Sequence, residues 1–511
     1  MVFSMKKINY YFVTLFLILL FCSCSNTIVI QDRQNTIDND RKMELVQYHI
    51  TDDYKVSSEE MMTDLQNFLE YSDDASPVAR SSVNSASKTT YSFTPIISKS
   101  VDLSKCKDTS INSKEIKASD NVTFSIVDVT SSDGESGYAI MTDDKRLGTL
   151  LAYSEGTSFQ EDISDDSFSN FIATSIDNYL SETKDMWDNI DENDYEALKK
   201  YYGITDAQIE EARKSQGDTP QAKAMFGVNY SSWSRPKQVG PLLKTDWDQF
   251  VYNKLIDEMR GKEENYPVGC GPLAAAQIMA YHKYPNKTTL STYNVKELSE
   301  KYSVSKGWNG EYNWEEILNN SEIGIRDASC LLYEIGKLSI TKYGYESSAW
   351  TPFLIDAMDN MGYETPHELY PTSNYSFDAV RKSLDKNCPV FVEGFTGGRY
   401  VGLPFWKWIE WGEGQGHAFV CDGYLYQERK KTTYVFWIPF RSTEKNEFVH
   451  LNPGWGGLAK GWYKSGIFDM NNGFTTDEEV SNVQKRGTTS NNKDYSRVVR
   501  IWTNIRPKEN V

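Results

Sequence analysis

The stretch 269–285 is predicted to be a tight turn that leads into a buried helix, and it constrains the fold more than any other segment. Gly269 and Gly271 allow the turn, and Pro272 suits the start of a helix because its missing N–H would be unpaired there anyway. The alanine-rich run that follows favours a slim helix that can pack closely on all sides. The helix should end at Pro285. Cys270 is therefore expected at the N-terminal end of a buried helix.

Cys270 has two interpretations. Unpaired N–H groups and the positive end of the helix dipole favour a thiolate, which is the nucleophilic form of cysteine. Alternatively, Cys270 is a small buried residue before a core helix, as most free cysteines are. The segments 416–420 and 450–457 favour the nucleophile, because they bring His417 and then Asn452. The order Cys, His, Asn, with roughly 150 residues between Cys and His, is typical of papain-like enzymes.

These three residue types can together cleave a peptide bond. Attack on a carbonyl requires an activated sulfur, a proton carrier for the leaving amine and donors for the oxyanion. Cys270 can be the nucleophile, and His417 the general acid and base in a thiolate–imidazolium pair. Asn452 can hold the imidazole ring in place, and the backbone N–H of Cys270 is a natural oxyanion donor.

At these residues the chain resembles the streptopain family of papain-like cysteine peptidases. The resemblance covers roughly residues 240–475, and its matching segments are 247–249, 252–253, 268–270, 274–279, 281–285, 416–424, 450–452 and 454–457. It implies an α+β fold, with a papain-like catalytic domain made of a helical part and an antiparallel β part. The first half of the chain also resembles the family's α+β prodomain, through 57–70 and 138–141.

The resemblance also implies roles for individual residues. Cys270, His417 and Asn452 would be the catalytic residues, with Trp455 in support. The residues implied as substrate contacts are Ser347, Ser348 and Gly416. The family further implies a zymogen, whose N-terminal half acts as an intramolecular inhibitor until it is removed. The expected partners are protein or peptide substrates.

Two positions depart from the family pattern. The family usually has Gln six residues before the nucleophile as an oxyanion donor, and here that position is Glu264. Asn265 is adjacent and could substitute, whereas Gln249 is more simply structural. The family's Trp after the orienting Asn is replaced by Pro453. Because loss of one oxyanion donor costs roughly a hundred- to a thousandfold in rate in another protease, a weak or narrowly specific peptidase is one expectation.

Length and charge limit the other possibilities. A chain of 511 residues is too long for one ordinary core, which predicts two domains and a leader. The net charge of −18 argues against nucleic acid as a partner. The seven cysteines include five beyond the leader at wide spacings, which makes a disulfide framework unlikely in a chain of this size. There is no CxxC motif or His/Cys cluster, so the sequence supports no metal and no cofactor.

The N-terminal residues are predicted to be a targeting segment. Lys6 and Lys7 precede an apolar run over 11–21, which is short for a membrane span and suits a signal peptide. The small residue before Cys24 resembles the processing site of bacterial lipoproteins, in which that cysteine is lipidated. An ordinary cleaved signal is the alternative. The expected location is the cell envelope, with the membrane contacted through the N-terminal lipid, and release after processing remains open.

The predicted organisation has five parts: a signal peptide (1–23), a tether (24–44), a prodomain (45–215), a linker (216–239) and a papain-like peptidase domain (240–511). Within the prodomain we expect a helix near 57–70 and strands near 122–126, 137–141 and 147–153. Within the peptidase domain we expect a helix near 325–337, strands at 389–393, 434–439 and 447–451, and polar turns at 428–433 and 441–445.

Two questions stay open at this point, the role of one aromatic segment and the function of the protein. The aromatic run 400–411 is either a substrate platform or lid, or a loop packed on the domain. The protein is either a peptidase or a surface binding protein on a peptidase scaffold, its chemistry weakened by Glu264 and Pro453. A third reading is another acyl-transfer enzyme of amidase or transglutaminase type, with Asp422 in the place of Asn452.

Overall fold

The computed structural model describes residues 54–75, 89–102, 121–157, 183–184, 186–203, 205–207, 226–261, 265–345, 347–365, 375–396, 415–435, 438–468 and 498–508, with single positions in 42–49 and 159–180. The chain forms two compact units. The first comprises Met1–Tyr54, Thr183–Gly227 and Tyr434–Ile438, and the second comprises Lys55–Glu182, Val228–Thr433 and Pro439–Val511.

In the first unit, helix α5 (Glu192–Tyr202) begins at a capping box in which Asp191 accepts hydrogen bonds from the N–H groups of Asn193 and Asp194. A small core packs Leu45, Tyr48, Tyr54 and Trp187. No helix among the described residues is long and apolar enough to span a membrane.

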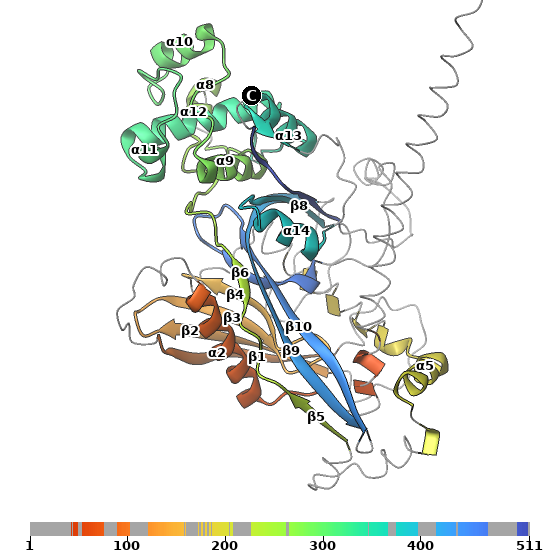
Figure 1. The fold of residues 1–511 in the computed structure, drawn as a ribbon. Coiled ribbons are helices and arrows are strands. Elements are labelled where there is room, and N and C mark those ends of the chain that lie inside the picture. Colours follow the sequence, from red (N-terminus) through yellow and green to blue (C-terminus); the bar gives the residue numbers. More distant parts are fainter. Residues whose placement is uncertain are drawn as a thin grey trace, which may run out of the picture. The chain divides into compact units, whose positions relative to one another are not determined.

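The second unit carries a large sheet (Figure 1). Its neighbouring strands are, in order, β1 (Tyr91–Asp102), β2 (Asn121–Ser131), β3 (Ser136–Thr142), β4 (Leu150–Glu155), β11 (Gly461–Lys464), β10 (Ile438–Asn452), β9 (Gln415–Val435), β8 (Val390–Thr396) and β12 (Val498–Trp502). Strand β6 (Lys237–Val239) pairs with β9, and β5 covers Phe226–Tyr230. A separate pair joins β7 (Tyr363–Glu364) to β13 (Arg506–Pro507).

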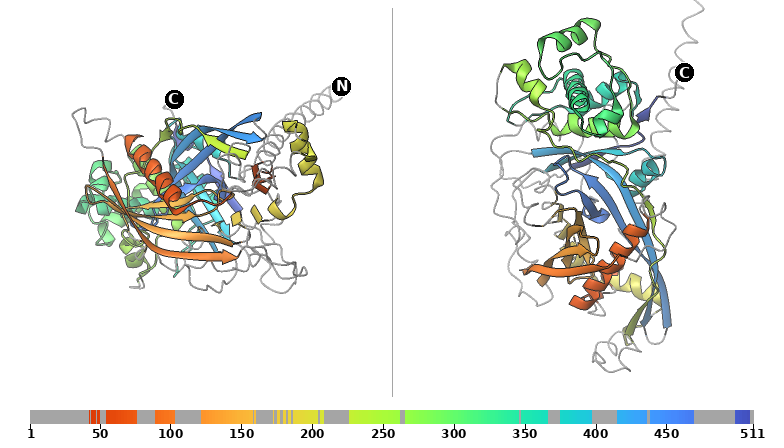
Figure 2. Two further views of the ribbon diagram at one scale, coloured as in Figure 1. Left: turned by 90° about the horizontal axis from the view of Figure 1, so that it is seen from below. Right: turned by 90° about the vertical axis from the view of Figure 1, so that its left-hand side faces the viewer.

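The helices fall into two groups. Helix α2 (Ser58–Ala75), which the sequence predicted near 57–70, packs on the strands β2–β4 and buries an apolar stripe at Met61, Leu65, Phe68 and Leu69. The second group of helices lies together in Figures 1 and 2. It comprises α8 (Lys254–Arg260), α9 (Cys270–His282), α10 (Thr292–Lys301), α11 (Trp314–Leu318), α12 (Glu322–Leu338) and α13 (Thr351–Asn360). Helix α14 (Phe377–Leu384) precedes β8, and a 3-10 turn η4 (Ser465–Ile467) follows β11. Helices and antiparallel strands thus confirm the predicted α+β class.

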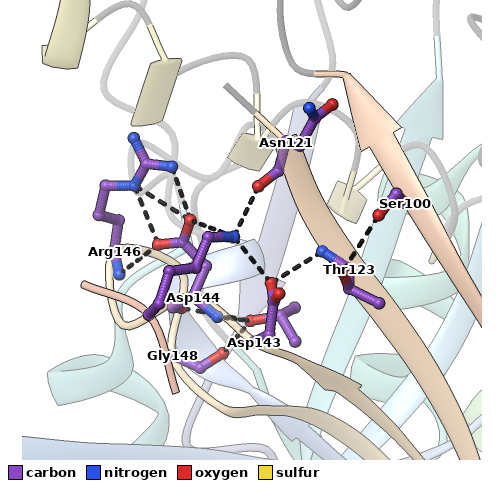
Figure 3. Close-up of polar contacts among 9 residues, drawn as sticks. Ser100, Asn121, Thr123, Asp143, Asp144, Arg146 and Gly148 are labelled. Atoms are coloured by element: carbon purple, nitrogen blue, oxygen red, sulfur yellow. Dashed lines mark hydrogen bonds and ion pairs between the residues drawn. The ribbon is translucent and has the colours of Figure 1, made fainter. Parts of the chain in front are cut away.

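The start of α2 is fixed by two features. Ser57 Oγ accepts from the Glu60 N–H at 3.2 Å while the Ser57 N–H donates to the Glu60 carboxylate at 2.9 Å, which is a capping box. Lys55, which lies shortly before α2, donates from Nζ to Asp143 Oδ1 at 3.0 Å in the turn after β3. In the same turn Arg146 and Asp144 form a buried pair, with Nη2 and Oδ2 2.6 Å apart (Figure 3). These contacts anchor the entry to α2 on the turn that follows β3.

The strands β9 and β10 overturn one prediction. The sequence analysis placed polar turns at 428–433 and 441–445, but both segments are strand. Their polar side chains pair with one another, as when Arg429 Nε donates to Glu444 Oε2 at 2.6 Å. The Arg429 guanidinium also lies over the rings of Tyr230 and Trp233, 4.0 and 4.4 Å from their centroids. Cross-strand charge pairs and cation–π contacts make a polar segment a stable strand where composition alone predicts a turn.

Candidate active site

Cys270 is the first residue of α9, as the sequence predicted. Gly269 caps the helix with φ 96°, a conformation that favours glycine. The next ten helical residues, 271–280, are buried. At Gly271 a Cβ would come within 2.3 Å of Leu354 Cδ1, so the start of α9 is pressed against α13. Cys270 itself is only partly buried, whereas Cys330, Cys388 and Cys421 are buried.

His417 lies near the start of β9 and is 2% exposed. It pairs in register with Gly394 of β8. Its Nε2 is 3.0 Å from the carbonyl oxygen of Pro453, and since a carbonyl can only accept, Nε2 carries the proton of this bond. The imidazole stacks on the Trp455 ring, with centroids 5.6 Å apart and an interplanar angle of 16°. The ring is therefore held at Nε2 and along one face.

The charge environment of the Cys270 thiol includes the His417 ring. Burial raises the pKa of Cys270, but the hydrogen bond and charge of His417 lower it, as do the N–H groups of Ala418 and Gly271. The net result is that the pKa of Cys270 lies below its ordinary value of 9.0. This is the direction that an activated nucleophile requires.

Asn452 lies next to this pair, but its side chain has other partners. Its Nδ2 donates to the carbonyl oxygen of Thr245 at 2.8 Å, and its Oδ1 accepts from the Gly454 N–H at 3.1 Å. Thr245 Oγ1 in turn donates to Gln277 of α9 at 2.9 Å. Asn452 is 2% exposed, so these bonds lie in the protein interior. Asn452 therefore fixes the turn that presents the Pro453 carbonyl to His417.

The Pro453 carbonyl is a functional group that the sequence analysis missed. In the sequence, Pro453 was notable only because it replaces the Trp that the family usually has at this position. A backbone carbonyl carries no residue-type signal, and any residue at this position can supply one. Trp455, by contrast, lies where a supporting residue is expected, against the face of His417.

The predicted oxyanion residues lie on the approach to α9. Asn265 has φ 51°, and its Oδ1 accepts from Asn253 Nδ2 at 2.9 Å, so its own amide N–H groups remain donors. Gln249 is 7% exposed and its carbonyl oxygen accepts from the Val268 N–H at 2.8 Å. Gln249 thus supports the backbone two residues before Cys270. Glu264, Cys24 and the aromatic run 400–411 lie outside the described residues.

The predicted substrate contacts flank the pair on two sides. Ser347 lies beside the turn before the nucleophile, since a Cβ on Gly269 would be 3.5 Å from its carbonyl oxygen. Its side chain is tied back to the loop, because Ser347 Oγ donates to the Gly344 carbonyl oxygen at 3.2 Å. Ser348 forms an antiparallel bridge with Lys342. Gly416 is exposed next to His417. Gly416 therefore lies beside His417, and Ser347 lies beside the turn before Cys270.

A buried carboxyl group lies behind the site. Glu393 of β8 pairs in register with Ala418, the residue after His417, and accepts from Thr351 Oγ1 at 2.5 Å. Burial raises the pKa of Glu393 to about 7, against the opposing effects of Thr351 and Arg500. Its bond to Thr351 directs it toward α13, so it belongs to the support of the site rather than to the pair itself.

Asp422 has a partner other than the candidate base. Its Oδ1 is 2.6 Å from His450 Nδ1, and its Oδ2 accepts from the Leu243 N–H at 2.9 Å. Both side chains are fully buried. Asp422 therefore orients His450, and nothing in this geometry supports its use as the third catalytic residue in place of Asn452.

Comparisons with known proteins show which sequences resemble this chain. Residues 247–463 match the model of the Peptidase C10 family. The chain is 25% identical over 353 residues to streptopain from Streptococcus pyogenes, which covers 64% of this chain and 71% of streptopain. It is 24% identical over 275 residues to the thiol protease/hemagglutinin PrtT from Porphyromonas gingivalis, covering 48% of this chain and only 27% of PrtT.

Two solved structures are also similar. A fragment of prointerpain A from Prevotella intermedia matches with a TM-score of 0.38 and 20% identity, over 68% of this chain and 90% of the fragment. Active interpain A from the same organism matches with a TM-score of 0.30 and 24% identity, over 44% of this chain and 86% of interpain A. Both TM-scores are low, so the assignment rests on the sequence matches. On that basis, residues 247–463 of the chain resemble the Peptidase C10 family, and the matches to that family and to streptopain support a cysteine-type peptidase.

Proposed function

We propose that the protein hydrolyses peptide bonds in proteins through a thiolate–imidazolium pair formed by Cys270 and His417. The observation that carries the proposal is the position of Cys270, a partly exposed thiol at the start of the buried helix α9, whose pKa His417 lowers. The match of residues 247–463 to the Peptidase C10 family supports the same reaction class. Two similar proteins are a thiol protease and streptopain, which is consistent with it.

The proposed reaction has two stages. The Cys270 thiolate attacks the scissile carbonyl carbon, and collapse of the tetrahedral intermediate breaks the C–N bond as His417 gives its proton to the leaving amine. His417 then takes a proton from water, the resulting hydroxide attacks the thioester, and the acid product leaves with Cys270 restored as a thiolate. The Cys270 backbone N–H and the Asn265 side-chain amide are the proposed oxyanion donors. Ser347, Ser348 and Gly416 are the proposed substrate contacts.

The regulation and location are also proposals. We assign residues 1–23 to a lipoprotein-type signal peptide, with Cys24 as the lipidated residue, and 24–44 to a tether. Residues 45–215 would form the inhibitory prodomain and 216–239 the linker cut on activation, leaving 240–511 as the peptidase. The continuous pairing of β4 with β11 supports an intimate association of the N-terminal strands with the peptidase. The protein would thus be an exported zymogen of the cell envelope.

A labelling experiment tests the proposed nucleophile. In substoichiometric iodoacetamide at pH 6 under mild reduction, Cys270 should be alkylated first and casein hydrolysis should fall in proportion to its labelling. The reason is that the pKa of Cys270 is lowered, whereas burial raises the pKa of each of Cys330, Cys388 and Cys421. Peptide mapping by mass spectrometry locates the label, and the alkylation rate as a function of pH should have its midpoint below 9.0.

The opposite outcome is equally clear. If casein is hydrolysed and full labelling of Cys270 leaves the rate unchanged, the nucleophile is wrong. The chain should also be assayed before and after limited proteolysis of the predicted linker. If neither form cleaves casein or shows preferential labelling of Cys270, the protein is interpreted as a surface binding protein and not as a peptidase.

A second prediction concerns the turn that carries the Pro453 carbonyl. Asn452→Leu should lower kcat/KM by about ten- to a hundredfold, mainly through kcat, because the hydrogen-bonded turn that orients His417 loses both of its side-chain bonds. The free energy of unfolding should fall by about 2–4 kcal/mol, since two buried backbone groups lose their partner. Steady-state kinetics and chemical denaturation measure the two effects.

The matched variant for this test is Thr245→Val. It removes the Thr245 Oγ1 bond to Gln277 but keeps the carbonyl that Asn452 uses. Its effect on kcat should be smaller than that of Asn452→Leu. Equal kcat values for wild type and Asn452→Leu would show that the turn does not depend on this side chain.

A further inference from the structure

A single carboxylate joins the N-terminal strands to the interior of the peptidase half. Glu155, the last residue of β4, accepts from Trp462 Nε1 at 2.7 Å through Oε1. Its Oε2 lies 3.7 Å from His450 Nε2. Trp462 of β11 and His450 of β10 are 1% and 0% exposed. The carboxylate thus meets an indole N–H and an imidazole that both lie inside the peptidase half.

The surroundings of His450 make it a cation. Asp422 of β9 holds its other nitrogen at 2.6 Å. Lys460, a cation that also acts on Glu155, is itself paired with Asp246 at 2.8 Å. Burial lowers the pKa of His450, but Asp422 and Glu155 together have the larger, opposite effect and raise that pKa from 6.5 to about 9. At neutral pH the group facing Glu155 is therefore an imidazolium, and a buried cation requires a negatively charged partner.

The contact lies in an otherwise continuous seam. Ala152, Tyr153 and Ser154 pair with β11, and the Glu155 N–H donates to the Lys460 carbonyl oxygen at 2.9 Å. On one face of this seam Phe68 of α2 packs against Phe448 and Trp462, with ring centroids 4.8 and 6.5 Å apart. The N-terminal strands therefore share both a sheet and an apolar core with the peptidase half.

We infer that His450 and Trp462 form a carboxylate-binding site whose ligand is Glu155, and that this site keeps the N-terminal half docked on the peptidase half after the connecting chain is cut. The inference rests on the proposed zymogen organisation, in which such a cut occurs. Activation then has two separate steps, because the cut frees the chain ends and a later loss of the Glu155 contact frees the N-terminal piece. The partner that fits the surface is an extended strand ending in an acidic side chain.

The contact predicts a pH window for docking. His450 has its pKa raised, so its contribution is complete below its ordinary value of 6.5 and is lost as the pH rises through about 9. Burial raises the pKa of Glu155, but His450, Trp462 and Lys460 lower it below its ordinary 4.5, so its contribution is complete above 4.5 and is lost at lower pH. The seam should therefore be strongest between pH 4.5 and 6.5 and should weaken steadily toward pH 10.

The test follows exchange of the two pieces. The chain from residue 25 onward carries Cys270→Ala, so that it cannot cut itself, and a recognition site for a sequence-specific protease after Gly217 in the predicted linker. After cutting, an unlabelled and a nitrogen-15-labelled complex are mixed, and native mass spectrometry follows the appearance of hybrid complexes. The pieces should co-elute at pH 6 in gel filtration. Glu155→Gln should speed their exchange by about ten- to a hundredfold, as expected for loss of a hydrogen-bonded charge.

The matched control is Glu135→Gln, which makes the same change at an exposed position in the turn between β2 and β3. The exchange rate of the Glu135→Gln complex should equal that of the unsubstituted complex. The unsubstituted complex should exchange faster at pH 10 than at pH 7, and Glu155→Gln should lose most of this pH dependence. Separation of the unsubstituted pieces at pH 6, or equal exchange in the two Gln variants, overturns the inference. If circular dichroism shows that the Glu155→Gln chain does not fold, the pH series of the unsubstituted complex decides, and exchange that stays constant up to pH 10 overturns it. No arm needs peptidase activity, so failure of the proposed chemistry would be seen separately.

Discussion

Replacing Cys270 with Ala should reduce hydrolysis of casein to background. The loss should be about a millionfold in kcat, the scale found in another protease when a residue of its catalytic unit is removed. The physical reason is that no acyl-enzyme can form without the sulfur, and none of the other described cysteines can replace it because they are buried and their pKa values are raised. Intact-mass spectra should also show that the wild-type chain converts itself to a shorter form while Cys270→Ala stays whole.

The matched control is Cys330→Ala. Cys330 is a fully buried residue of α12, and its replacement removes a sulfur without touching the Cys270–His417 pair. This variant should lose some stability and retain its turnover. Hydrolysis by Cys270→Ala at a rate near that of the wild type would mean that a different group attacks the substrate.

Replacing His417 with Ala should cost nearly as much activity as replacing Cys270. Residues that act as one unit do not contribute additively, so either loss disables the pair. The thiol should also change, since His417 supplies the hydrogen bond and charge that overcome the effect of burial on the pKa of Cys270. The midpoint of the alkylation rate against pH should therefore move upward, and at pH 6 the rate should fall at least tenfold.

His282→Asn is the control for this experiment. His282 lies at the other end of the same helix, and burial lowers its pKa to about 4, so it is neutral at the pH of the assay. This variant should leave the alkylation profile of Cys270 where it was. An unchanged profile in His417→Ala would show that the thiolate is stabilised by the helix start alone.

Local signals made the nucleophile helix predictable. Gly269, the alanine-rich run and Pro285 act within a few residues of one another, and α9 begins at Cys270 as they indicate. The capping box at Ser57 and Glu60 is equally local, and α2 begins directly after Ser57. In both cases the sequence determines the backbone over a span shorter than the helix itself.

The remaining features depend on residues distant in the chain. The length of β9 and β10 depends on cross-strand pairs such as Arg429 with Glu444, which no single segment reveals. The partner of His417 Nε2 is a backbone carbonyl, and the partners of Asn452 include the backbone of residue 245. The contact of Glu155 with His450 joins strands from opposite halves of the chain. Such contacts become visible only once the fold has brought the segments together.

The pairing of β4 with β11 has a consequence for biosynthesis. Ser154 Oγ donates to the Lys460 carbonyl oxygen across 306 positions in the sequence. While the ribosome is still making the chain, β4 has an open edge until 306 further residues have been added after Ser154. A loop of this size closes slowly, because the entropy of bringing its ends together must be overcome before any contact rewards it. A stop codon anywhere before β11 would therefore leave not only the peptidase unfinished but also the earliest-made strands without their neighbour.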